Sequence, residues 1–318
     1  MTTFKEIRGT AIRSVSSDPS NPEEGQIWYN NTIGVLKGYR SLGGVWATGG
    51  NLSTARNDLG GAGTQTSALG FGGSTTVAVT NTEEYNGSTW GPGGNLATAR
   101  FGGGGAGTQT AGLAFGGNFP VTNATEEYDG SIWTGGGNMG TGRYALGSCG
   151  TQTAGLAFAG RAQPATTNAT EEYDGSAWTA GGNMARTGNA QIRLAGAGIQ
   201  TAALGFGGFT VNETEEYDGS AWTAGGNLNT SRWSLAGAGT QTAGLGFGGY
   251  TTAATGATEE YNGTSWTNSG NLATARWELA GCGTQTSALG FGGINPTNLA
   301  VTEEFTDPTF AVQKITTS

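Results

Sequence analysis

The feature that most constrains the fold of this chain is an internal repeat of about 44 residues. Successive copies start at Trp46, Trp90, Trp133, Trp178, Trp222 and Trp266, so the spacings are 44, 43, 45, 44 and 44 residues. A period of this length, punctuated by Trp and Gly-Gly, is typical of β-propeller blades, in which each blade is one four-stranded sheet. The sequence therefore predicts an all-β propeller built on these six structural tryptophans.

Turn residues divide each copy into four short strands. In one copy the first strand is expected over residues 100–106, the second over 108–117 and the third over 125–130, and the fourth starts near Ser131 and carries Trp133. An Asn-Gly or Asp-Gly pair such as Asp129-Gly130 then joins the third strand to the fourth, because both residues can adopt a positive φ. The second strand alternates bulky and small residues, so its bulk is expected to fit against glycine of the next blade.

The ends of the repeat indicate how the ring closes. Residues 46–56 match the fourth-strand pattern, whereas residues 307–312 have lost the Trp and the Gly-Gly-Asn. We therefore expect the strand from Val45 to Gly49 to complete the sixth blade, which removes the open edges of a linear array. The alternative is a degenerate seventh blade made from residues 26–46, with its missing strand supplied by residues 310–317.

Several motifs recur together in register. Phe-Gly-Gly closes the second strand, Glu-Tyr-Asp or Glu-Tyr-Asn lies in the third, and Trp lies in the fourth, followed by Gly-Gly-Asn-Leu and Thr-x-Arg. This set resembles the kelch repeat over about residues 46–305. The resemblance implies a kelch-like propeller and by itself says almost nothing about function.

Composition excludes several classes of function. The net charge of −9 and the absence of a basic stripe argue against nucleic acid as a partner. No apolar run approaches the roughly 20 residues of a membrane span, and residues 1–30 contain no apolar core typical of a signal peptide. There is no histidine, and Cys149 and Cys282 occupy alanine positions of blades three and six, so we expect two buried thiols, no disulfide, no metal site and no cofactor.

Every copy carries a pair of adjacent glutamates, and five copies carry an arginine at one fixed place. Neighbouring strand residues point to opposite faces, so the two carboxylates diverge and do not form the converging pair of a glycosidase. We expect one glutamate to accept a hydrogen bond from a buried arginine or a backbone N–H, and the other to be solvated. In the fourth copy the common role falls to Arg186 or Arg193, and the extra residues form a loop. Because six equivalent copies show no break in symmetry, the chain is not expected to be an enzyme.

The first 40 residues differ from the repeat and set the biological hypothesis. Residues 1–40 are interpreted as a docking or oligomerisation arm with a small β-meander, residues 41–306 as the propeller and residues 307–318 as a tail. The run Pro-x-x-Gly-Gln-Ile-Trp-Tyr-Asn, with a Leu-Lys-Gly-Tyr strand after it, resembles short modules of tailed-bacteriophage fibre and virion proteins. It implies a virion structural protein that contacts other virion proteins through residues 1–40. It also implies possible homo-oligomers. The alternatives are a non-viral interaction scaffold and a carbohydrate-active enzyme.

The connections between second and third strands vary most among the copies. Such loops lie on one rim of a propeller, where binding residues of rigid scaffolds usually occur. The candidate contacts to a host glycan or protein are Phe119, Arg161, Phe209, Tyr250 and Asn295. A second aromatic set, Phe101, Tyr144, Trp233 and Trp277, is expected to pack in the core or between blades.

Overall fold

The computed structural model describes residues 12–19, 26–40, 43–307 and 311–314. These residues fall into two compact units. One spans Val45–Thr306, and the other combines the N-terminal segment up to Gly44 with the segment that starts at Asp307.

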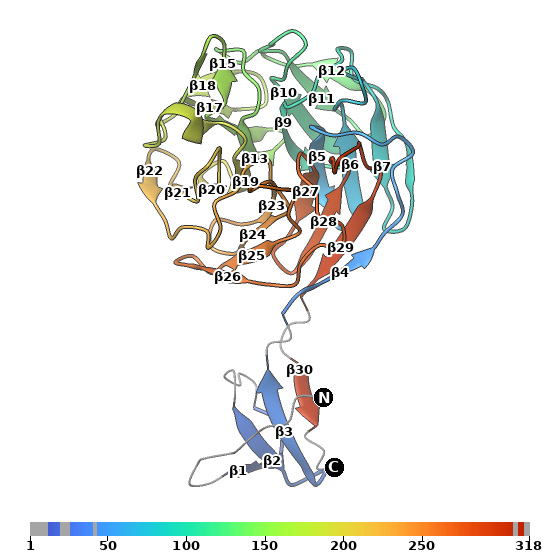
Figure 1. Ribbon diagram of the computed structural model, residues 1–318, viewed down its shortest axis with the longest axis vertical. Helices are drawn as coiled ribbons and strands as arrows, with labels where there is room; N and C mark the ends of the chain where they lie inside the picture. The colour runs from blue at the N-terminus through green and yellow to red at the C-terminus, as the bar shows by residue number, and fades with distance from the viewer. Residues whose placement is uncertain (1–11, 20–25, 41–42, 308–310, 315–318) are drawn as a thin grey trace. The chain divides into compact units, whose positions relative to one another are not determined.

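Within the described residues, the larger unit is a six-bladed β-propeller (Figure 1). Blade one contains β5 (Gly60–Thr64), β6 (Ser67–Phe71), β7 (Thr82–Tyr85) and β8 (Trp90–Pro92). Blade two contains β9 (Gly104–Thr108), β10 (Ala111–Phe115), β11 (Thr125–Tyr128) and β12 (Trp133–Gly135). Blade three contains β13 (Gly147–Thr151), β14 (Ala154–Phe158), β17 (Thr170–Tyr173) and β18 (Trp178–Ala180).

The remaining blades follow the same order. Blade four contains β19 (Ala195–Ile199), β20 (Ala202–Phe206), β21 (Thr214–Tyr217) and β22 (Trp222–Ala224). Blade five contains β23 (Ala236–Gly239), β24 (Gly244–Phe247), β25 (Thr258–Tyr261) and β26 (Trp266–Asn268). Blade six contains β27 (Ala280–Gly283), β28 (Ser287–Phe291), β29 (Thr302–Thr306) and β4 (Val45–Thr48). A short hairpin of β15 (Arg161–Ala162) and β16 (Ala165–Thr166) decorates blade three, and the 3₁₀ helix η1 (Gly188–Gln191) precedes blade four.

The ring closes as the sequence predicts. Strand β4 pairs antiparallel with β29, and Phe305 lies opposite Trp46. The alternative of a seventh blade is wrong, although part of its strand pairing exists: β30 (Ala311–Lys314) pairs with β3 (Val35–Arg40) in the other compact unit. Strand β4 thus covers the edge of blade six.

Several expected strand boundaries are corrected, and the second and third strands of blade two are shorter than expected. The first strand of blade two begins at Gly104 instead of Arg100, and Thr108 ends this strand instead of opening the second. Gln109 lies in the turn, where its side-chain amide donates to the carbonyls of Ala68 and Tyr85 in the preceding blade, at 3.0 and 2.7 Å. Gln109 therefore links blade two to blade one through hydrogen bonds. The equivalent glutamine does the same in every blade: Gln65, Gln152, Gln200, Gln241 and Gln285.

The hairpins between third and fourth strands also differ in detail from the expectation. Gly130 has φ 93°, but Asp129 does not adopt a positive φ. Its carboxylate instead accepts hydrogen bonds from the backbone N–H groups of Ser131 and Ile132, both at 2.9 Å. Aspartate or asparagine stabilises this hairpin by forming an Asx turn, and only the glycine adopts the left-handed conformation.

Adjacent blades pack as expected, with aromatic bulk against glycine. Trp90 of blade one lies on Phe291 of blade six, with ring centroids 4.8 Å apart. A Cβ added to Gly70 would meet the Phe291 ring at 2.8 Å, so only glycine lets the rings approach this closely. The Trp90 indole N–H donates to Thr302 Oγ1 at 2.9 Å, which satisfies its polar group inside the interface. The same tryptophan–phenylalanine contact recurs at all six interfaces.

The first glutamate of each pair forms the expected ion pair with a buried arginine. Arg56 is fully buried and lies 2.5 Å from Glu83. In blade four the partner of Glu215 is Arg186, at 2.7 Å, which decides between the two candidates. The expected extra loop there contains η1. The other pairs are Arg100–Glu126, Arg143–Glu171, Arg232–Glu259 and Arg276–Glu303.

The second glutamate is not simply solvated, which corrects the expectation. Glu84 is half-buried and accepts a hydrogen bond from the Tyr128 hydroxyl of the next blade at 2.6 Å. Burial, together with this hydrogen bond, raises the pKa of Tyr128 to about 12. The strand therefore uses its two faces for different tasks, because one glutamate holds its own blade together and the other joins two blades.

Both cysteines are free thiols in buried positions, as predicted. Their sulfhydryl groups point at the carbonyls of Ile199 and Thr64, at 3.9 and 3.6 Å. Burial raises the pKa of Cys149 and of Cys282 to about 12, so both stay protonated and unreactive at neutral pH.

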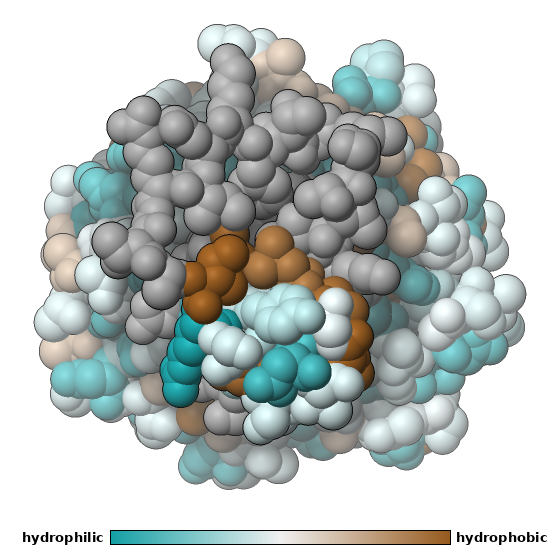
Figure 2. Space-filling view, turned by 90° about the horizontal axis from the view of Figure 1, so that it is seen from below, coloured by the Kyte–Doolittle hydropathy of each residue, from teal (hydrophilic) through white to brown (hydrophobic). Residues whose placement is uncertain are grey.

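The smaller unit is a four-stranded sheet, here called the terminal sheet. It contains β1 (Arg13–Val15), β2 (Ile27–Asn30), β3 and β30, with β1 parallel to β2. Trp28 is fully buried and donates from its indole to Asp18, which also bonds Asn30 and Lys37. These hydrogen bonds lower the pKa of Asp18 to about 2, and the bond from Lys37 has the largest effect. Ile12, Tyr29 and Ile33 are exposed, and Figure 2 shows apolar residues beside hydrophilic ones on the viewed face.

Candidate ligand-binding site

One rim of the propeller collects the variable parts of all six blades. The connection from an outer strand to the next inner strand lies on the same rim as the loop between second and third strands, because the strands of a blade alternate in direction. Residues of the two connections pair with each other, as Trp233 does with Tyr250. Loop residues therefore lie beside the residues that surround the propeller axis.

Six equivalent residues, one from each blade entrance, surround this axis and are here called the axial ring. They are Asp58, Gly102, Ala145, Arg193, Ser234 and Glu278. The backbone N–H of each donates to the carbonyl of the preceding one at 2.7–2.9 Å, and Asp58 closes the circle by donating to Glu278. All six have φ between 50° and 63°, although only one of them is a glycine. Left-handed backbone at non-glycine residues costs about 1 kcal/mol or more each, and such residues cluster at functional sites.

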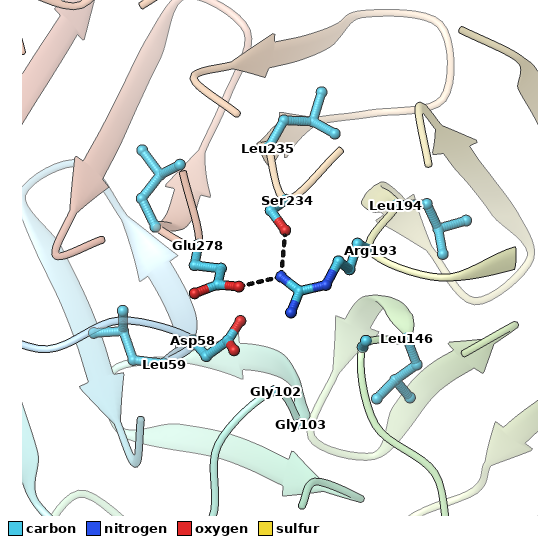
Figure 3. Close-up of a pocket in the computed structure, with 12 residues that line it drawn as sticks. Asp58, Leu59, Gly102, Gly103, Leu146, Arg193, Leu194, Ser234, Leu235 and Glu278 are labelled. Carbon is cyan, nitrogen blue, oxygen red and sulfur yellow. Dashed lines mark hydrogen bonds and ion pairs between the residues drawn. The ribbon is translucent and has the colours of Figure 1, made fainter. Parts of the chain in front are cut away.

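The axial ring opens into a cavity of about 90 Å³. Leucines such as Leu59, Leu194 and Leu235 line the cavity together with the ring, and Figure 3 shows Asp58, Arg193, Ser234 and Glu278 pointing toward one another. A space of this size accommodates a few waters or one small polar group. The leucines lower the local dielectric, so charges in the ring interact strongly.

The polar side chains of the cavity differ in the hydrogen bonds that they make. The Arg193 guanidinium donates to Glu278 and to Ser234 Oγ, the latter at 2.8 Å. Glu278 also accepts from the Asn57 side-chain amide at 2.7 Å. Within the described part of the chain, no side chain donates a hydrogen bond to the Asp58 carboxylate. Among the described residues, Asp58 is therefore the carboxylate of this cavity that has no side-chain hydrogen-bond donor.

The charges of the cavity shift two pKa values. Burial, and then the negative charge of Glu278, raises the pKa of Asp58 to about 7, although Arg193 acts in the opposite direction. Burial disfavours the charged form of Arg193, but the carboxylates of Asp58 and Glu278 outweigh it and raise the pKa of Arg193. Two carboxylates face one guanidinium, so the cavity holds one net negative charge when Asp58 is ionised.

Aromatic residues flank the charged half of the axial ring. Phe209 lies 5.0 Å from Trp233, Trp233 lies 5.1 Å from Tyr250, and Tyr250 lies 5.4 Å from Trp277, measured between ring centroids. All four are half-buried, and the Arg193 guanidinium lies 5.8 Å from the Trp277 ring centroid. We call these four residues the aromatic cluster. It forms an apolar surface beside the carboxylates.

The rim residues that the sequence singled out lie at different distances from the axial ring. Arg161 and Tyr250 pair directly with Tyr144 and Trp233, and the Phe209 N–H donates to the Ile192 carbonyl at 3.1 Å. Phe119, 64% exposed, and Asn295, also exposed, lie one residue farther along their loops. The structure thus brings Phe209 and Tyr250 into one cluster and leaves the other three apart from it.

The second aromatic set is not part of the core. Phe101, Tyr144, Trp233 and Trp277 are all half-buried and directly precede the axial ring residues of their blades. Two of them do pack between blades, because Trp233 contacts Phe209 and Trp277 contacts Tyr250. Their position at the rim follows from the left-handed residue that comes next, which turns the chain toward the axis.

Symmetry is broken at the axial ring, contrary to the interpretation that the copies are equivalent. The residue two positions after the recurring arginine is aspartate, glycine, alanine, serine or glutamate in five blades, and Arg193 follows the insertion in the fourth. Sequence reasoning missed these residues because it compared the differences among copies only in the connections between second and third strands. A comparison of the copies at this one position would have found them.

The described residues contain no group of three or more histidine, cysteine, aspartate or glutamate side chains placed to hold a metal ion. Nor does any helix among them have the length and apolar character needed to cross a membrane. No protein-family model matches the chain, and no curated protein sequence matches it either.

Proposed function

We propose that this protein is a non-catalytic attachment module that binds a surface glycan. The binding surface is the rim of the propeller that carries the axial ring, here called the axial rim. The observation that carries the proposal is the pairing of the aromatic cluster with the polar cavity of the axial ring. Aromatic faces stack on the apolar faces of sugar rings, and carboxylate, guanidinium and hydroxyl groups bind sugar hydroxyls. A concave site with apolar walls and a few convergent polar groups is the usual form of a small-ligand site.

Rigidity of the scaffold supports the same function. The rim residues are held by a closed ring of backbone hydrogen bonds and by blades that are fastened to one another through tryptophan, glutamine and tyrosine side chains. A pre-organised site loses little conformational entropy on binding. We further propose that the blades are of the kelch type, on the motifs Phe-Gly-Gly, Glu-Tyr-Asp and Thr-x-Arg.

We propose a bacteriophage virion as the biological setting, with the propeller as part of a tail fibre, appendage or decoration. The support is the resemblance of residues 22–30 and the following strand to modules of virion proteins. In this proposal residues 1–40 dock onto other virion proteins, and the propeller contacts the host surface. Strands β1 and β30, which come from opposite ends of the described chain, lie in one sheet, and this sheet offers a single attachment point.

Binding of the labelled full-length chain to a glycan array and to intact bacterial cells tests the proposal. We expect saturable binding that falls at least tenfold in the triple variant Phe119→Ala, Phe209→Ala, Tyr250→Ala. The control variant Ile132→Ala, Ile199→Ala removes two exposed apolar side chains outside the axial rim and should bind like the wild type. Circular dichroism and thermal melting establish that both variants are folded. Binding that survives in the folded triple variant, or no saturable binding of the wild type, would refute the proposal.

A further inference from the structure

The cavity of the axial ring has a chemistry that selects among sugars, and this inference rests on the proposed function. Glu278 is already engaged by Arg193 and Asn57, and Ser234 is engaged by Arg193. Asp58 is the one carboxylate of the cavity that receives no hydrogen bond from a side chain within the described residues. A ligand that enters the cavity therefore meets an unpaired acceptor.

The net charge of the cavity determines the sign of the charge that the ligand should carry. With Asp58 ionised, two carboxylates face one guanidinium, and the surrounding leucines reduce screening by solvent. A cation that reaches Asp58 would balance the remaining negative charge, whereas an anion would be repelled. Burial, and then the charge of Glu278, raises the pKa of Asp58 to about 7, and a cation bound beside Asp58 would favour its charged form.

The size of the cavity limits the cation. A space of about 90 Å³ accepts an ammonium group together with the atoms next to it. The aromatic cluster begins directly beside the cavity, because Trp233 and Trp277 precede Ser234 and Glu278 in the chain. A sugar ring can therefore lie on the aromatic faces while a substituent reaches into the axial ring.

We propose that the axial ring binds the free ammonium group of an amino sugar, with Asp58 as its acceptor and the aromatic cluster as the surface on which the ring lies. An N-acetylated amino sugar lacks the charge and is larger at the same position. A neutral sugar offers only a hydroxyl group there. Both should bind more weakly than the sugar with the free amine.

Isothermal titration calorimetry of the full-length chain at pH 7 tests this proposal. The probes are three β-1,4-linked hexasaccharides, built from glucosamine, from N-acetylglucosamine and from glucose. We expect the glucosamine hexamer to bind at least tenfold more tightly than either of the others. Asp58→Asn should reduce that affinity at least tenfold while leaving binding of the glucose hexamer unchanged.

The matched control is Asp129→Asn, which removes the same charge from a hairpin where blades one and five naturally carry asparagine. It should bind like the wild type. Asparagine tolerates the left-handed backbone of Asp58, so the test variant should fold, and its thermal melt checks this.

Three outcomes would overturn the proposal. Equal affinity for the three hexamers, or unchanged affinity in Asp58→Asn, would show that the ammonium group is not recognised. Trilysine binding as tightly as the glucosamine hexamer would place recognition in charge alone. If array glycans still bind through the aromatic residues in these cases, the proposed function stands, whereas failure of every saccharide and cell surface removes both.

Discussion

At the residue scale, the informative positions are those where the six copies disagree. Five non-glycine residues of the axial ring adopt left-handed backbone, and one blade shows that glycine would serve there. A chain optimised for stability alone would place glycine at each of these positions. Aspartate, arginine, serine and glutamate stand there instead at a cost in stability, which is why we propose a binding role for their side chains.

Asp58 provides a prediction on pH. Its pKa is about 7 in the folded protein and near 4 in the unfolded chain, so the folded state holds an extra proton between these values. Stability contributed by the protonated group is therefore complete below pH 4 and is lost as pH rises through 7. We expect Asp58→Asn to raise the free energy of unfolding by about 1 to 2 kcal/mol at pH 8, after discount for solvent screening, and to change it little at pH 4.

The groups that face Asp58 are Glu278 and Arg193, and Tyr144 acts on Arg193. Denaturant titrations at several pH values measure the difference between the variant and the wild type. A difference that does not depend on pH would contradict the assignment, because it would show that Asp58 titrates alike in both states.

At the element scale, the third strand of each blade carries two glutamates with different tasks. Glu83 faces the fully buried Arg56 of its own blade, and Glu84 accepts the Tyr128 hydroxyl of the next. Adjacent residues of one strand thus stabilise the blade and the interface between blades, because they point to opposite faces. Their sequence looks like a catalytic pair, but the two carboxylates diverge, and each is bound to a side chain of the scaffold.

This division predicts unequal effects of the same substitution. Glu83→Gln leaves the Arg56 guanidinium buried without a counter-ion, so it should lower the free energy of unfolding by about 3 kcal/mol or more. Glu84→Gln keeps an oxygen that accepts the Tyr128 hydroxyl, so it should cost about 1 kcal/mol. The shift in the urea midpoint measures both, and equal losses would contradict the assignment of the two faces.

At the scale of the whole molecule, the blades close into a ring through one strand from far away in the sequence. Strand β4 supplies the outer strand of blade six and brings Trp46 onto Phe247 of blade five. Without it, β29 would be an open sheet edge and the Trp46 contact would be missing. An open edge with a bare apolar surface promotes association between chains.

Shortened chains test the closure. A chain of residues 44–307 keeps β4 and should be a folded monomer, since residues 45–306 form a compact unit. A chain of residues 50–307 lacks β4 and should aggregate or lose cooperative unfolding. Size-exclusion chromatography with light scattering, together with thermal melts, compares the two. A monomeric, cooperatively folded 50–307 chain would show that closure is not needed for stability.

The blade number, the closing strand and the buried arginines followed from the sequence alone. These features depend on local turn chemistry and on a regular spacing, and both can be read from neighbouring residues such as Asp129-Gly130 or from the tryptophan positions. The turn role of Gln109 and the bond from Tyr128 to Glu84 could not be read in this way, because each joins two blades. The axial ring was decided by the tertiary structure for the same reason: Asp58, Arg193 and Glu278 are more than 80 residues apart and meet only when six blades close around one axis.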